Sequence, residues 1–280
     1  MLEWILLAVG VVGFGAAGYL DLKTTEFPDW LPYSIIIAAL VIRGIFAYTT
    51  GNLDLIINSI TIGVGFLLFG LALYYLRQWG DGDAWLLGAL GFLFPDAAGF
   101  IPAATLNLPF YYIQIFNFFL VAFAYLIIYS LALGMKNPKI WKSYKKDLIK
   151  DKNGLIILIV AFAAIALGVV YYLNISAGIP LYRMYNILLL PPLFIFLILF
   201  VRYGRHIEKV LFRKQIDVKD LTAGDVPMTD KWRVLDDKEV KELKKKGGKI
   251  WIKEGVRLAP VFIISMLISI FFGTLLVLFI

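Results

Sequence analysis

Eight long blocks of apolar residues recur along the 280-residue chain and constrain its fold more than any other feature. A bilayer span needs about 20 mostly apolar residues, and most of these blocks reach or approach that length. Because lipid offers the backbone no hydrogen-bond partner, and because no strand-like alternation is visible, we expect the blocks to be α-helices. The predicted spans are residues 2–20, 31–48, 55–76, 84–104, 110–133, 154–173, 185–201 and 258–280.

Composition agrees with this interpretation. Hydrophobic residues make up 61% of the chain, and its mean hydropathy is +0.82. A soluble globular domain does not carry so much apolar sequence in blocks. The sequence therefore predicts an all-α polytopic membrane protein with six to eight transmembrane helices and a small cytoplasmic α+β domain before the last helix.

The fourth block is interrupted. Pro95 and Asp96 follow Phe94, so the apolar stretch that begins at Ala84 is only about 16 Å long as a helix, against about 30 Å of hydrocarbon. Either the helix kinks and continues, or it stops partway through the bilayer.

Basic residues gather in alternate connections. All but two of the 27 Lys and Arg residues lie after the first, third, fifth or seventh block, the exceptions being Arg43, expected to snorkel outward, and Arg183. Cytoplasmic loops attract this excess of positive charge. We therefore predict a multi-pass protein of the cell membrane with the N-terminus outside, and basic loops that contact anionic lipid headgroups of the bilayer and no nucleic acid.

Four parts of the chain are expected. Residues 1–134 form a transmembrane core, and residues 135–201 form a basic loop followed by two further spans. Residues 202–257 form a small basic domain, in which Asp236 or Asp237 begins a helix that reaches Lys246 and precedes a strand in the sequence KIWIKEG. Residues 258–280 form the last span.

Acidic residues lie at two block edges on the predicted cytoplasmic side. Asp21 ends the first block, and the sequence GDGD, which contains Asp81 and Asp83, opens the fourth. Glycines in both blocks are expected to let the two backbones approach and bring Asp21 and Asp83 together. These glycines are Gly10, Gly13, Gly15, Gly18, Gly88 and Gly91.

The residue types that the chain lacks limit the reactions that it could catalyse. The chain has no cysteine and one histidine, His206, which we interpret as a solvated surface residue in a basic stretch. A pair of carboxylates that shares one proton can activate a water molecule against a peptide bond, so we expect no metal and no cofactor. Since Asp83 opens a helix and Asp21 ends one, the helix dipoles predict that Asp83 is the more ionised partner.

The residues resemble those of the type IV prepilin peptidases, and in particular the archaeal preflagellin and prepilin peptidases. The resemblance covers residues 15–95 well and 215–275 more loosely. Where it leads us to expect an apolar run with proline after Gly255, the chain has Val256, Arg257 and Leu258. The residues that carry the resemblance are Asp21, Pro28, Asp29, the GxGD motif of Gly80, Gly82 and Asp83, and Ala89, Leu90 and Gly91.

The resemblance implies an aspartic endopeptidase that removes the short basic class III signal peptide from pilin or archaellin precursors at the cytoplasmic face. Asp21 and Asp83 correspond to the family's catalytic pair. Glu26 and Asp29 are candidates to bind the basic leader, with a solvated loop as the alternative, and Asp81 is either a substrate contact or a turn residue facing water.

Two other functions stay open. A presenilin or signal-peptide-peptidase type of intramembrane protease also uses a GxGD aspartate, although its Pro-Ala-Leu motif is missing from this sequence. An aspartate-dependent transporter could use Asp96 and the broken fourth block. The sequence does not determine the oligomeric state, or which precursor is cleaved.

Overall fold

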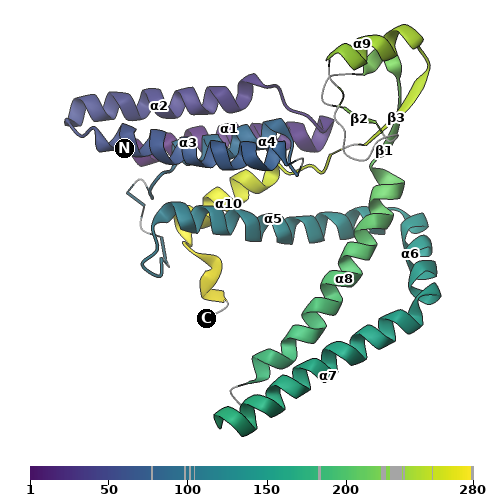
Figure 1. The fold of residues 1–280 in the computed structure, drawn as a ribbon. Coiled ribbons are helices and arrows are strands. Elements are labelled where there is room, and N and C mark those ends of the chain that lie inside the picture. The colour runs from purple at the N-terminus through teal and green to yellow at the C-terminus, as the bar shows by residue number, and fades with distance from the viewer. Residues whose placement is uncertain are drawn as a thin grey trace. The chain divides into compact units, whose positions relative to one another are not determined.

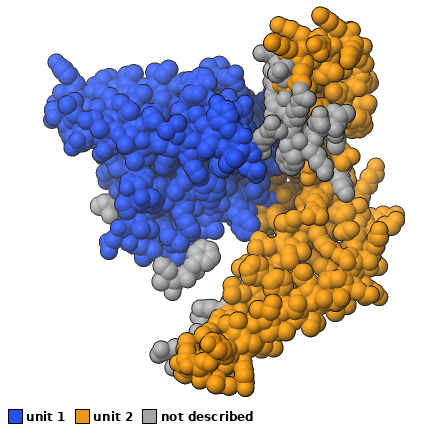
Figure 2. All heavy atoms as spheres, in the orientation of Figure 1, with its two compact units in different colours: residues 1–126, 230–233, 254–280 blue, residues 127–229, 234–253 orange. Residues whose placement is uncertain are grey.

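The computed structural model describes residues 1–76, 78–97, 99–100, 102–103, 105–181, 184–221, 225–227, 235, 237–253 and 255–278. Arg183 and Asp236, which entered the sequence-based predictions, lie outside these residues. The chain forms two compact units, shown in different colours in Figure 2. The first contains residues 1–126, 230–233 and 254–280, and the second contains residues 127–229 and 234–253.

The predicted class, an all-α polytopic membrane protein, is confirmed. Among the described residues, six helical stretches are long and apolar enough to cross a bilayer. They are α1 (Leu2–Thr24), α2 (Trp30–Thr50), α3 (Asp54–Tyr75), α5 (Phe110–Met135), α7 (Lys152–Ala177) and Leu190–Glu208 within α8 (Tyr185–Leu211) (Figure 1).

Two of the eight predicted spans are wrong in length. Helix α4 (Asp81–Leu93) has 13 residues, and α10 (Pro260–Phe271) has 12. Pro95 cannot donate a backbone hydrogen bond, and Phe94 before it has already left helical geometry at φ −131° and ψ 68°. After α10, Gly273 adopts φ 78°, a conformation that favours glycine, and a short 3₁₀ turn, η3 (Leu275–Leu278), follows.

Buried polar side chains from neighbouring helices bind the free end of α4. Arg43 of α2 is completely buried and donates to the Leu93 carbonyl at 2.8 Å, and Ser59 of α3 donates to the Phe92 carbonyl at 2.6 Å. These are carbonyls that a helix end leaves without an intrahelical partner. The expectation that Arg43 snorkels outward is therefore wrong, because its guanidinium has an acceptor inside the bundle.

Helix α4 is the central element of the first unit. Every residue from Leu86 to Leu93 is buried, and α4 packs against α1, α2, α3 and α10. A helix that is apolar on all sides needs such an enclosed position. The short helix that carries the GxGD motif is thus held by neighbours on every side.

The glycines of the first and fourth blocks do not face each other as expected. A Cβ atom on Gly18 would lie 3.1 Å from Pro260 Cα of α10, whereas one on Gly88 would lie 2.9 Å from Leu67 Cβ of α3. Glycine therefore lets α1 approach α10 and lets α4 approach α3. Of the α1 glycines, Gly10 faces α4, and a Cβ atom on it would lie at an ordinary contact distance of 3.5 Å from Leu93 Cδ1.

The second unit combines membrane-type helices with a small α+β part. The strands β1 (Arg213–Asp217), β2 (Val226–Pro227) and β3 (Lys249–Lys253) form an antiparallel sheet in the order β1-β3-β2. Helix α9 (Asp237–Lys246) covers it through a cluster that includes Leu221, Val240 and Ile252. The predicted helix ending at Lys246 and the predicted strand after it are both confirmed.

A basic helix, α6 (Pro138–Lys150), forms much of the connection after α5, and it buries Ile140 and Tyr144 against α8. His206 of α8 lies against this helix: its Nδ1 is 3.0 Å from Ser143 Oγ, and its Nε2 is 3.7 Å from Asp147 Oδ2. The side chain of His206 is 14% exposed. The interpretation of His206 as a solvated surface residue is therefore wrong, and it helps join α6 to α8.

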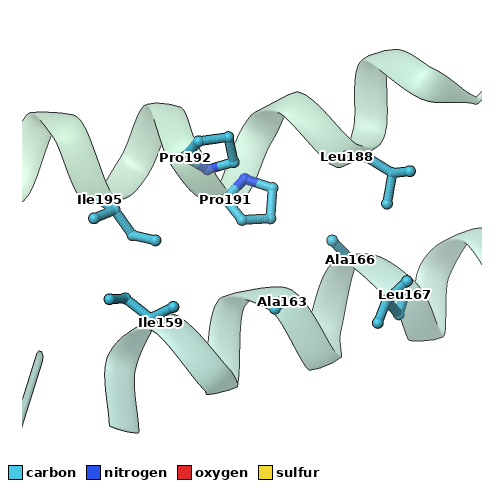
Figure 3. Close-up of a pocket in the computed structure, with 8 residues that line it drawn as sticks. All are labelled: Ile159, Ala163, Ala166, Leu167, Leu188, Pro191, Pro192 and Ile195. Atoms are coloured by element: carbon cyan, nitrogen blue, oxygen red, sulfur yellow. The ribbon is translucent and has the colours of Figure 1, made fainter. Parts of the chain in front are cut away.

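An apolar pocket of about 330 Å³ lies between α7 and α8 in the second unit (Figure 3). Its lining contains no polar side chain, so the pocket offers no catalytic group. The lining residues are Ile159, Ala163, Ala166, Leu167, Leu188, Pro191, Pro192 and Ile195.

Candidate active site

Asp21 lies in the last turns of α1 and is 6% exposed. Its Oδ2 accepts a hydrogen bond of 2.9 Å from the backbone N–H of Ala259, the residue that precedes α10. A carboxylate is stabilised at the start of a helix, because the free N–H groups and the helix dipole both present positive charge there. The first aspartate is therefore held in place by a segment more than two hundred residues away in sequence.

Asp83 is the third residue of α4, and Gly80 is the N-cap of that helix. The Asp83 carboxylate accepts a hydrogen bond from the Gly80 backbone, as acidic residues at this helix position often do. A Cβ atom on Gly82 would lie 2.7 Å from the Phe27 ring. Gly82 thus lets the loop after α1 pack tightly against the turn that carries Asp83.

The two aspartates act on each other electrostatically. Burial raises the pKa of the Asp83 carboxyl to about 7, and the negative charge of Asp21 contributes to that rise. Asp83 keeps part of its surface open to solvent, although protein surrounds it on most sides. Burial is the largest cause of the rise at Asp83, because protein replaces the water that would stabilise its charged form. Two interacting carboxyls titrate as a pair, so the order in which Asp21 and Asp83 release their protons stays a prediction.

A second acidic pair lies beside the first. Asp81 opens α4, and burial followed by the charge of Asp29 raises the pKa of its carboxyl. Trp85 donates a side-chain hydrogen bond to Asp81, and the Trp85 ring packs edge-on against Tyr33 with centroids 4.6 Å apart. The structure thus brings together two of the three residues predicted to contact substrate, next to two aromatic rings.

The third predicted substrate contact, Glu26, is placed differently. Its side chain is exposed, and its backbone carbonyl accepts a hydrogen bond of 2.6 Å from Thr24 Oγ1. The described contacts do not join the Glu26 carboxylate to Asp29, which sits at the N-cap of α2 without a capping side-chain bond. Within the described part of the chain, no three acidic or histidine side chains gather as metal ligands would.

Sequence reasoning missed two contributors to the site. They are the backbone N–H of Ala259 and the side chain of Arg257, whose Nη1 donates to the Leu22 carbonyl at 2.6 Å. The visible signal was the charged residue at position 257, where the resemblance suggests an apolar run. Nothing local in the sequence shows that this segment returns to the end of α1.

The raised pKa of Asp83 makes the free energy of unfolding depend on pH. Between the ordinary Asp pKa of 3.8 and about 7, the folded protein keeps a proton on Asp83 that the unfolded chain releases, so stability falls as pH rises through this window. We expect Asp83→Asn to remove this dependence and to raise the Tm at pH 8 more than at pH 4. Thermal unfolding in detergent micelles at both pH values checks this. Equal Tm changes at the two pH values would contradict it.

The fold and this pair of interacting aspartates define a class: a polytopic α-helical membrane protein with a two-carboxylate site at the ends of two helices. Residues 8–131, which contain both aspartates, match the model of the type IV leader peptidase family. The match confirms the resemblance seen in the sequence and supports a peptidase of this kind. No curated protein and no solved structure gives a significant match to the chain.

Proposed function

We propose that the protein is a membrane-embedded aspartic endopeptidase in which Asp21 and Asp83 are the catalytic residues. The observation that carries the proposal is the electrostatic interaction of Asp21 with Asp83. Two carboxyls that interact in this way can share one proton, because ionising both would place two negative charges close together. The ionised Asp21 accepts a proton from the attacking water molecule. The protonated Asp83 donates a hydrogen bond to the scissile carbonyl and then its proton to the oxygen that becomes negative, which gives a tetrahedral diol. Asp21 then passes its proton to the leaving nitrogen as the C–N bond breaks, and Asp83 takes a proton back from the diol.

The proposed substrates are precursors of pilins or archaellins that carry a short basic leader. Three observations support this: the family match, the acidic pair of Asp29 and Asp81 beside the catalytic pair, and the alternate placement of basic connections. By the positive-inside rule, the ends of α1 and α4 that carry the aspartates lie on the cytoplasmic side of the cell membrane. A basic leader would reach an acidic surface there.

The test uses membranes that contain the full chain, mixed with tagged pilin and archaellin precursors. Cleavage appears as a small shift to higher mobility, and mass spectrometry of the product locates the cut. The precursor that is processed faster identifies the preferred substrate class. If neither precursor is cut, the proposed activity is wrong, and a transporter function becomes the stronger alternative.

Replacing Asp29 and Asp81 together by asparagine should weaken recognition of the basic leader. Each exposed carboxylate contributes about 0.5 to 1 kcal/mol to binding of a cation, so we expect KM to rise roughly 5- to 30-fold while kcat changes little. Kinetics with a precursor whose leader lysines are replaced by glutamine supply the control, because the double variant should no longer differ from the wild type on that substrate. A fall in kcat at unchanged KM would assign these residues to the chemical step instead.

A further inference from the structure

We propose that residues 257–259, and Arg257 above all, position Asp21 for catalysis. This inference rests on the proposed function and adds to it a residue outside the matched region 8–131. Arg257 is a positioning residue, because it binds the backbone beside Asp21 and leaves the carboxylate itself free to meet the substrate.

The contacts are specific to one turn of α1. Arg257 Nη1 donates to the Leu22 carbonyl at 2.6 Å, and Ala259 N donates to Asp21 Oδ2 at 2.9 Å. Residues 257–259 therefore bind two successive residues at the end of α1, one through the Arg257 side chain and one through the Ala259 backbone. Gly18, one turn earlier on α1, makes these contacts possible, since its missing side chain lets Pro260 approach.

The charges around Asp21 fit this role. Asp83 on α4 is the acidic group that interacts with Asp21, and the guanidinium of Arg257 lies close enough for its positive charge to act on the same carboxylate. The nearest basic residue on α1 itself, Lys23, is directed elsewhere, with its ammonium 5.9 Å from the centre of the Tyr19 ring. Arg257 and the start of α10 both favour negative charge on Asp21, which suits this carboxyl to act as the base of the pair.

The positioning role of Arg257 explains why the sequence after Gly255 departs from the apolar run that the resemblance predicts. An apolar run in place of Val256, Arg257 and Leu258 could still begin α10, but it would supply no charge and no donor for the Leu22 carbonyl. An arginine here fixes the end of α1 through a charged donor, which is stronger than a neutral one. The chain thus carries its own support for Asp21 in a segment far from the GxGD motif.

The experiment measures kcat and KM for precursor cleavage from pH 4.5 to 8.5 with wild type and Arg257→Gln. Loss of the neighbouring positive charge makes the charged base harder to form, so the acidic limb of the kcat profile should move up by about 0.5 to 1 pH unit. Well below the midpoint of the acidic limb, kcat should then fall about 3- to 10-fold, while KM and the alkaline limb stay near the wild-type values. Lys23→Gln is the matched control, because it removes one positive charge from the same end of α1 without touching residues 257–259.

The outcomes separate this inference from the proposed function. Absence of cleavage by the wild type removes the proposed function, whereas cleavage by the wild type with superimposable profiles for Arg257→Gln overturns the role of Arg257. If Arg257→Gln does not accumulate in membranes, Arg257→Met takes its place, because it also removes the positive charge and keeps a long side chain. An acidic limb that stays at the wild-type pH in Arg257→Met also overturns the inference.

Discussion

Asp21→Asn and Asp83→Asn should each reduce precursor cleavage by at least about a thousand-fold, because the two carboxyls act as one unit and neither amide can transfer a proton. Asparagine keeps the shape of each side chain, and in Asp21→Asn the amide oxygen can still accept the hydrogen bond from Ala259 N. The loss should therefore fall on kcat, with both variants folded and present in the membrane at wild-type levels. Quantified processing of a tagged precursor, normalised to enzyme content, measures the effect.

Asp81→Asn is the matched control for this loss. Asp81 lies two residues before Asp83 on the same helix turn, but its partners are Trp85 and Asp29. We expect this variant to keep at least about a tenth of the wild-type kcat. If Asp81→Asn abolished cleavage while Asp21→Asn did not, the pair would have to be reassigned to Asp81 and Asp83.

Arg43→Met should destabilise the protein by about 3 kcal/mol, although Arg43 has no part in the proposed chemistry. The guanidinium is completely buried and donates to the carbonyls of Leu93 and Leu55, which the replacement leaves without these bonds. A buried acceptor that loses its partner costs about 1 to 3 kcal/mol, and the ion pair with Asp96 at 3.7 Å is lost as well. Thermal unfolding in detergent measures the change.

Ser59→Ala provides a graded comparison. It removes a single neutral hydrogen bond to the Phe92 carbonyl at the same end of α4, so we expect a loss of about 1 kcal/mol. Equal stability of Arg43→Met and wild type would show that the end of α4 does not need its charged partner.

The apolar blocks predicted the helices correctly wherever the helix is stabilised by its own sequence. Blocks such as residues 55–76 satisfy their own backbone and require nothing from distant residues. The ends of α4 and α10 were predicted less well, because block length does not show where a helix stops. Pro95 signalled a break but could not show whether the helix continues beyond it, since that depends on Arg43 and Ser59 of two other helices.

In the candidate site, too, the features that depend on local sequence were predicted and those that depend on distant residues were not. The acidic motifs alone were enough to select Asp21 and Asp83 as candidates, because few residue types can hydrolyse a peptide bond in a chain without cysteine. The burial that raises the pKa of Asp83 could not be predicted from the motif, since it depends on tertiary packing. The contributions of Arg257 and Ala259 could not be predicted, because no local pattern indicates that residues so distant in sequence meet.

The bond between Ala259 and Asp21 also sets the order of events during synthesis. Both aspartates and the whole matched region leave the ribosome before residue 257 is made. A nascent chain that has already inserted its first helices therefore lacks the partner that holds Asp21. On the proposed function, the site would become competent only after residues 257–259 have been made, long after both aspartates.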